Sequence, residues 1–394
     1  MASSSSSSTL YKNYPWTQTP LIINGPMAGS AGPELAAAVT NAGGIGFIGG
    51  GVDMAQLDAD MDKARSLLAP HVFAAASPSP SSADDDNNDG PILPIGIGIL
   101  CFGAPLAAAA AAIRRHRPAA VWLFAARDDD GNDGNGGDEG DGDGDGTGDG
   151  NGNRYGNYAP WTAAIRAASP RTAVWIQIGS VGAALAAAAT SASPPPDVLV
   201  AQGADAGGHG FERGAGVVAL VPEVADALAE SGLDGKVAVV AAGGIVEARG
   251  AAAALALGAG GVVMGTRFLA SEEVGGPAYY GRRVLEARDG GVRTVRSKAF
   301  DEARAGGNVW PALGLVNRTY ADFVAGGEVA EIRRLHGEEQ KGGRAGDGEV
   351  EDMRVTVWAG TGVGLVKEVL PAGRIVEEVR EGARKVLKSL SAQV

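Results

Sequence analysis

Two kinds of sequence alternate regularly over residues 20–270, and this alternation leaves few possible folds. Short runs rich in β-branched and apolar residues have the length of strands, and the alanine-rich runs between them have the length of helices. The strands are expected at 21–25, 45–50, 94–100, 120–125, 173–179, 197–203, 237–244 and 261–268. The helices are expected near 33–43, 53–69, 105–117, 158–168, 181–190, 220–230 and 247–258. Eight strands with seven intervening helices predict an α/β fold, a (β/α)8 TIM barrel over 20–270, with an open doubly wound sheet as the alternative.

Low-complexity sequence interrupts this barrel pattern twice, at about 77–91 and about 127–156. Both stretches are rich in Gly, Pro, Ser or Asp and lack core-forming residues, so they are predicted to be disordered inserts. A calcium loop beginning at Asp141 is excluded, because Gly152 stands where a bidentate carboxylate is needed, and no metal site is predicted. Residues 1–19 are expected to form a flexible tail, and residues 271–394 a partly helical extension that packs on the barrel.

The charge and the composition exclude several kinds of partner. Fourteen acidic residues in or near the two inserts account for the whole of the formal net charge of −13, so no nucleic-acid-binding face is indicated. No apolar run reaches the ~20 residues that span a bilayer, and the serine-rich start is not a secretory signal. The single cysteine, Cys101, excludes an internal disulfide and is expected to be a small buried residue. A cytoplasmic protein is predicted, and no pattern identifies an oligomer interface.

Glycine-bearing strand ends predict a phosphate site. Gly243 and Gly244 end the seventh strand, and Gly265 and Thr266 end the eighth, the two positions where TIM barrels usually bind phosphate. The helix near 247–258 is expected to direct its positive end toward the same place. The stretch "GIGFIG" at 44–49 satisfies the dinucleotide fingerprint, but here the glycines follow a helix and precede a strand, which is the inverse of the required order.

One of the four histidines lies in a segment almost free of side chains, "AQGADAGGHGFERG" at 201–214. His209 follows the sixth strand, where a barrel places functional groups, and an imidazole can act as a general base near neutral pH. Together with the phosphate site, this histidine predicts a phosphate-bearing planar cofactor, for which FMN is the natural candidate. The other histidines, His71, His116 and His336, are expected at the surface.

Four ordered motifs resemble those of the nitronate monooxygenases. They are "GPMAGSAGPELAAAVTNAGGIGFIGGG", "GADAGGHG", "AAGGI" and "MGTRF", and the similarity extends to "FDEARAGGNVWPALGLVNRTY" at 300–320. The resemblance implies oxidation of an alkyl nitronate or nitroalkane by FMN and O₂, which yields a carbonyl compound and nitrite. The sequence differs from some relatives on the third strand, where it has "GIGIL" and lacks an asparagine, which leaves its subclass open.

The resemblance also implies roles for individual residues. His209 would be the catalytic histidine. The cofactor-binding residues would be Pro26, Met27 and Ala28 beside the flavin, Gln177 near the ring, Gly207 and Gly208 making room for it, and Gly243, Gly244, Gly265 and Thr266 around the phosphate. Two alternatives stay open: a flavin-dependent reductase similar to the enoyl-ACP reductases, and a non-catalytic FMN- or phosphate-binding barrel.

Overall fold

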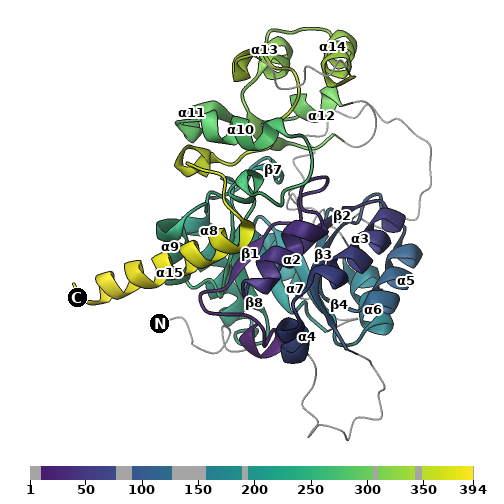
Figure 1. Cartoon of the computed structure of the whole chain (residues 1–394), viewed down its shortest axis with the longest axis vertical. Helices are drawn as coiled ribbons and strands as arrows, with labels where there is room; N and C mark the ends of the chain where they lie inside the picture. The colour runs from purple at the N-terminus through teal and green to yellow at the C-terminus, as the bar shows by residue number, and fades with distance from the viewer. Residues whose placement is uncertain are drawn as a thin grey trace, which may run out of the picture.

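The computed structural model describes residues 10–76, 91–126, 157–188, 194–304, 309–341 and 348–393. Its main sheet has eight parallel strands: β1 (Ile22–Asn24), β2 (Phe47–Gly51), β3 (Leu93–Leu100), β4 (Pro118–Phe124), β5 (Ala173–Ile178), β6 (Val198–Gln202), β8 (Ala238–Ala242) and β9 (Val262–Met264). Their order is β1-β9-β8-β6-β5-β4-β3-β2, and a parallel bridge between Ile23 and Ile45 joins the two edges. The predicted TIM barrel is therefore confirmed (Figure 1).

Helices connect successive strands of the barrel. They are α2 (Pro33–Asn41), α3 (Met54–Leu67), α4 (Pro70–Ala76), α5 (Leu106–His116), α6 (Ala159–Ala168), α7 (Val181–Ala188), α8 (Val217–Glu230) and α9 (Ala248–Ala256). Every residue of β4 and β5 is buried. This continuous burial is expected of parallel strands that face side chains inside the barrel and helices outside it.

The expectation of a flexible tail over 1–19 is wrong for the part of it that the structure describes. Residues 10–13 are helical, and the Leu10 and Tyr14 side chains are buried. The Trp175 indole in β5 donates a 2.7 Å hydrogen bond to the Tyr14 hydroxyl, and the Trp16 indole donates to the Gly44 carbonyl at 3.2 Å. Apolar surface at the amino-terminal end of the barrel must be covered, and this aromatic segment covers it.

A second group of elements follows the barrel, over residues 271–370, which we call the cap. It contains α10 (Tyr279–Glu286), α11 (Gly290–Arg293), β10 (Thr294–Ser297), α12 (Ala299–Ala303), β11 (Ala312–Leu315), α13 (Arg318–Val324), α14 (Val329–Lys341) and the 3₁₀ turn η4 (Thr361–Leu365). The cap has a hydrophobic cluster of its own and lies beyond one end of the barrel (Figure 1). A barrel loop contributes β7 (Gly208–His209), which pairs antiparallel with β11, so the three-stranded sheet β10-β11-β7 joins the cap to the barrel.

The last helix, α15 (Ala372–Ser391), returns to the barrel and packs against α2 and α9 (Figure 1). The buried Arg380 guanidinium donates hydrogen bonds to the carbonyls of Pro20, Ala42 and Gly43. Strands β1 and β9 pair with each other. Helix α15 therefore lies over the seam where the first and last strands of the barrel meet.

Apart from Pro91, the two predicted inserts lie outside the described residues. Among the helices that the structure does describe, none combines the length and the apolar character needed to cross a membrane.

Candidate active site

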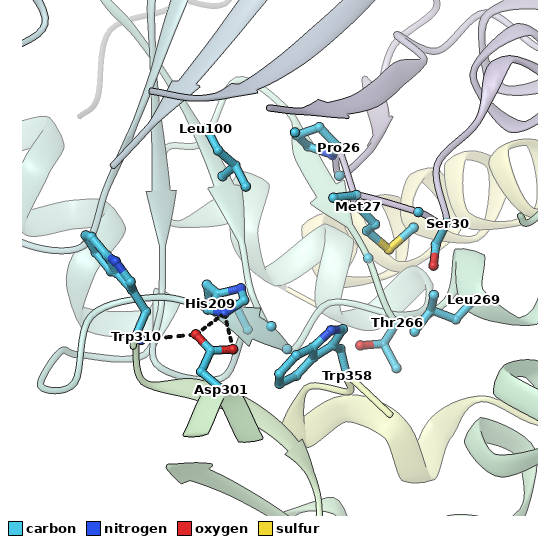
Figure 2. Close-up of a pocket in the computed structure, with 18 of the residues that line it drawn as sticks. Pro26, Met27, Ser30, Leu100, His209, Thr266, Leu269, Asp301, Trp310 and Trp358 are labelled. Carbon is cyan, nitrogen blue, oxygen red and sulfur yellow. Dashed lines mark hydrogen bonds and ion pairs between the residues drawn. The ribbon is translucent and has the colours of Figure 1, made fainter. Parts of the chain in front are cut away.

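A cavity of about 1190 Å³ lies between the carboxyl ends of the strands and the cap. The residues that the sequence singled out come from five different strand ends, and all of them line this one cavity. They are Pro26, Met27, Ala28, Gln177, Gly207, Gly208, His209, Gly243, Gly244, Gly265 and Thr266. Figure 2 shows Pro26 and Met27 on one side of the cavity and His209 on the other, with Trp358 and Thr266 below them in this view.

His209 is paired with a carboxylate from the cap. Its Nε2 lies 2.9 Å from Oδ1 and 2.8 Å from Oδ2 of Asp301 in α12 (Figure 2). The Trp310 backbone N–H donates to Asp301 Oδ2 at 3.1 Å, and only 11% of the carboxylate side chain is exposed, against 34% of the imidazole. Because an ionised carboxylate only accepts, Nε2 carries the hydrogen, which leaves Nδ1 of a neutral imidazole free to accept a proton.

The cap fixes the position of this histidine from two further directions. Strand β7 pairs with β11, with His209 opposite Ala312. The Trp358 ring lies against the imidazole, with 5.2 Å between ring centroids, and the Arg304 guanidinium lies 5.7 Å from the centre of the same indole ring. The barrel loop supplies the imidazole, while the cap supplies its carboxylate partner and its wall.

Glycine is required at the two positions before His209 for two different structural reasons. Gly208 adopts φ +77°, and a Cβ placed there would meet no atom within 4 Å. Glycine is therefore required at this position by the backbone conformation and not by a lack of space. A Cβ on Gly207 would come within 2.6 Å of the Ala359 and Gly360 backbone. The expectation that Gly207 leaves room for a ligand ring therefore needs correction, because the space beside it holds the chain's own cap segment.

The predicted phosphate site has a backbone conformation that favours glycine, and it has a hydroxyl donor. Gly243 and Gly244 have φ of +117° and +70°, which residues with side chains rarely adopt. The Thr266 oxygen accepts a 2.9 Å hydrogen bond from Gly360 N, so its own O–H remains able to donate to a ligand. The Glu247 carboxylate caps α9 by accepting from Gly250 N at 3.2 Å, so a negatively charged side chain lies at the positive end of that helix. The contribution of this helix end to phosphate binding stays a prediction.

The packing of neighbouring side chains explains the two glycines of the third strand, β3. A Cβ on Gly96 would come within 2.4 Å of the Phe47 ring, and one on Gly98 within 2.3 Å of Pro26 Cβ. The "GIGIL" sequence thus admits Phe47 to the barrel interior and lets the Pro26 segment lie over the strand. Ile99 and Leu100 at its end give the cavity an apolar wall.

Comparison with known proteins assigns the family. A family model described as nitronate monooxygenase matches residues 13–89 and 159–382. The nitronate monooxygenase npaC of Metarhizium robertsii is 44% identical over 391 residues, 98% of this chain and 97% of that protein. The chain belongs to the nitronate monooxygenase family. A nitronate monooxygenase of Neurospora crassa is 34% identical and matches 96% of this chain and 93% of its own length.

Solved structures of low sequence identity share the fold. FabK from Thermotoga maritima superimposes with a TM-score of 0.68 at 23% identity, with 98% of each chain covered. A nitroalkane oxidase from Streptomyces ansochromogenes gives a TM-score of 0.66 at 24% identity, covering 94% of this chain and 98% of its own.

Several side chains of this nitronate monooxygenase site were not identified from the sequence. Asp301 lies in the "FDEARAGG" stretch that carried part of the family resemblance, but its pairing with His209 depends on how the cap folds onto the barrel. Trp358 lies outside every motif that was recognised. Gln202 ends β6 and lines the cavity, and its place at a strand end was the signal that could have identified it.

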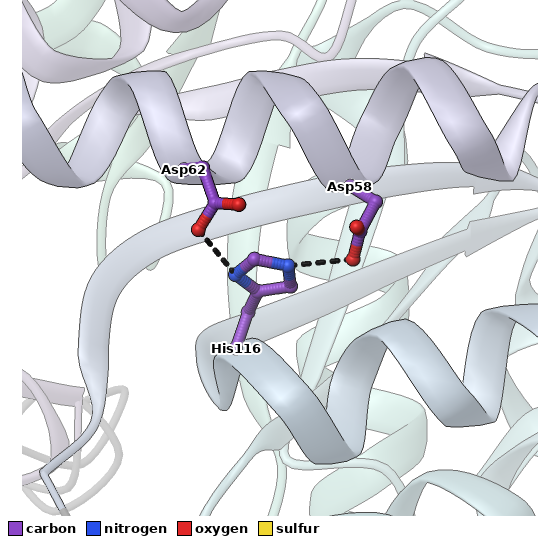
Figure 3. A group of neighbouring side chains, drawn as sticks. All are labelled: Asp58, Asp62 and His116. Carbon is purple, nitrogen blue, oxygen red and sulfur yellow. Dashed lines mark hydrogen bonds and ion pairs between the residues drawn. The ribbon is translucent and has the colours of Figure 1, made fainter.

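Two histidines expected at the surface are buried. His336 in α14 is 4% exposed, and burial together with the nearby Arg304 lowers its pKa. His116 at the end of α5 is 2% exposed, with Nε2 2.7 Å from an Asp58 oxygen and Nδ1 3.7 Å from an Asp62 oxygen (Figure 3). His71 is exposed, as expected.

The group formed by Asp58, Asp62 and His116 has the composition of a metal site, but each of its side chains already has a partner within the protein. Arg115 forms ion pairs with both carboxylates, and Asp62 lies 2.9 Å from its guanidinium. These contacts join α3 to α5 and explain the group without an ion.

Proposed function

We propose that this protein is an FMN-dependent enzyme that oxidises alkyl nitronates with O₂ to a carbonyl compound and nitrite. Family membership supports the reaction class. The observation that carries the proposal is the His209–Asp301 pair, which lines the same cavity as a glycine-lined cup beside Thr266. A base and a phosphate site in one cavity are what a flavin enzyme acting on a carbon acid needs.

The residues present fit FMN. Gly243 and Gly244 hold backbone conformations that side chains would disturb, and Thr266 retains a hydroxyl donor, so the three would hold the phosphate. The cavity volume of about 1190 Å³ leaves space for a tricyclic ring and a small substrate. Bound FMN would supply the electron transfer to O₂.

The chain's own residues would then handle the proton and orient the substrate. Asp301 fixes the Nε2–H tautomer of His209, so Nδ1 can take the proton from the carbon beside the nitro group of a neutral nitroalkane. The resulting imidazolium would be stabilised by the Asp301 carboxylate and could hold the anionic nitro group of the nitronate. Trp358 and Leu100 would limit water around the reacting carbon.

The test is oxygen uptake and nitrite release by flavin-loaded protein with a panel of alkyl nitronates. We expect flavin absorbance in the purified protein and stoichiometric nitrite. Anaerobic bleaching of the flavin by NADPH, with no oxygen uptake on any nitronate, would instead favour the reductase alternative. Protein that purifies without flavin and does not bind added FMN would contradict the proposal.

A further inference from the structure

A continuous line of side-chain hydrogen bonds crosses the floor of the cavity and ends at the backbone of His209. The Trp122 indole Nε1 in β4 donates to Gln177 Oε1 in β5 at 3.0 Å. Gln177 Nε2 donates to Gln202 Oε1 in β6 at 2.9 Å, and Gln202 Nε2 donates to the His209 carbonyl in β7 at 3.2 Å. Four adjacent elements of the chain thus contribute one group each.

The two ends of this line determine the orientation of both amides. An indole N–H can only donate and a peptide carbonyl can only accept. Gln177 must therefore turn its oxygen toward Trp122, which directs its NH₂ group to Gln202. Gln202 must turn its own oxygen toward Gln177, which directs its NH₂ group to His209. Reversing either amide would place two donors or two acceptors against each other.

The Trp122 ring is held by its neighbours, so it cannot rotate away and break its hydrogen bond to Gln177. It is 3% exposed, stacks on Trp175 with 6.2 Å between centroids, and meets the Phe47 ring edge-on at 5.4 Å. Trp175 in turn donates to the Tyr14 hydroxyl at 2.7 Å. The fixed end of the line is part of the rigid barrel interior, and its other end is the loop that carries the catalytic histidine.

The orientation of the two glutamine amides determines which hydrogen-bonding groups the cavity floor offers to a ligand. Gln177 and Gln202 both line the cavity, and each amide has a second N–H that no group in the described part of the chain accepts. Arg296 adds to the same effect on the loop side, since its guanidinium binds the carbonyls of Ala204 and Ala206 at 3.3 and 2.9 Å. The carbonyls of Ala204 and Ala206 are thereby engaged, and the second amide N–H groups of Gln177 and Gln202 remain available to a ligand.

We propose that Trp122, Gln177 and Gln202 are positioning residues, which hold the His209 peptide and present amide N–H donors to the electron-rich atoms of the bound flavin. The inference rests on the proposed function for the identity of the ligand, although the restraint on His209 does not depend on it. Trp122 also borders the cavity, but in this role it acts through its hydrogen bond to Gln177.

The chain provides a matched control for the test. Trp122→Phe removes the indole donor that orients the amides. Trp175→Phe removes an indole donor from the same aromatic cluster, but it keeps an aromatic ring against Trp122 and none of the hydrogen bonds of the line involves it. Gln177→Glu is the second variant: a carboxylate still accepts from Trp122 but cannot donate to Gln202, which would then turn its oxygen toward the His209 carbonyl.

Two readouts other than activity apply. In apoprotein, hydrogen exchange of the peptide covering 203–210 should become about 3–10-fold faster in Trp122→Phe and Gln177→Glu, and stay unchanged in Trp175→Phe. In titrations with FMN, the dissociation constant should rise about 3–10-fold in Trp122→Phe, with a larger rise in Gln177→Glu and none in Trp175→Phe.

Equal behaviour of Trp122→Phe and Trp175→Phe in both readouts would overturn the inference, since it would show that the indole acts only by packing. Failure of the proposed function has a different signature. If wild-type protein did not bind FMN, the exchange rates in apoprotein would still report whether the line restrains His209.

Discussion

Replacing Asp301 with asparagine tests the central pair of the site. The change keeps the size of the side chain and removes the charge that lies 2.8 and 2.9 Å from His209 Nε2. A hydrogen bond to a charged group contributes roughly 1.5–3 kcal/mol, and each 1.36 kcal/mol is a factor of ten in rate. Because 34% of the imidazole side chain is exposed and solvent weakens the interaction, the lower end applies, a loss on the order of 10–30-fold.

The loss should appear only where His209 must become charged. With a neutral nitroalkane, the histidine takes a proton, and kcat/KM for oxygen uptake should fall by the full factor in Asp301→Asn. With the pre-ionised nitronate the proton is already gone, so the fall should be several-fold smaller. Equal losses on the two substrates would refute the assignment of Asp301 as the partner that stabilises the imidazolium, and unchanged rates on both would remove it from the mechanism.

Three further predictions use the same protein. His209→Ala should retain FMN while its turnover of a neutral nitroalkane falls ~10²–10⁴-fold, and equal, small losses on nitroalkane and nitronate would show that another residue is the base. Gly244→Val should fold but lose FMN and unfold at a lower temperature, because its φ of +70° costs a side chain roughly 1–3 kcal/mol and Asp205 Cβ lies 3.0 Å from the new Cβ; full flavin content would place the phosphate elsewhere. Burial raises the pKa of the Cys101 thiol to about 12, so below pH 9 a thiol reagent should react slowly with the native protein. After unfolding, the same reagent should modify one thiol per chain quickly. Since the unfolded thiol ionises near pH ~8.5, this group should favour unfolding as the pH rises above that value, and a rapid native reaction would contradict its burial.

The barrel could be predicted from the sequence because its signals are local. Most strands are short buried runs that end at or just before a glycine or a polar residue, and most helices are alanine-rich runs, so the order of elements follows from patterns a few residues long. The placement of Gly243, Gly244, Gly265 and Thr266 in one cavity follows from the rule that strand ends of a barrel share one face.

What the sequence did not predict depends on contacts between distant segments. Tyr14 is buried because it packs against the barrel interior and accepts a hydrogen bond from Trp175. The serine-rich sequence that precedes Tyr14 does not predict this contact. Asp301 reaches His209 across 92 positions of the chain, through an antiparallel pairing between β7 and β11 that a two-residue strand is too short to predict. His116 looked exposed because arginines surround it, whereas its burial depends on carboxylates from α3.

The position of α15 has a consequence for how the protein is made. Strand β1 is the first barrel strand to be synthesised, its partner β9 is the last, and the helix that covers their junction follows about 100 residues later still. Arg380 then joins α15 to carbonyls from residues 20–43, near the opposite end of the chain. A nascent chain can form its early helices and strands on the ribosome, but the junction of β1 and β9 stays uncovered until α15 has been synthesised. Ribosomes that stop before Ala372 would release a barrel whose seam exposes apolar faces of α2 and α9, a form suited to recognition by chaperones and proteases.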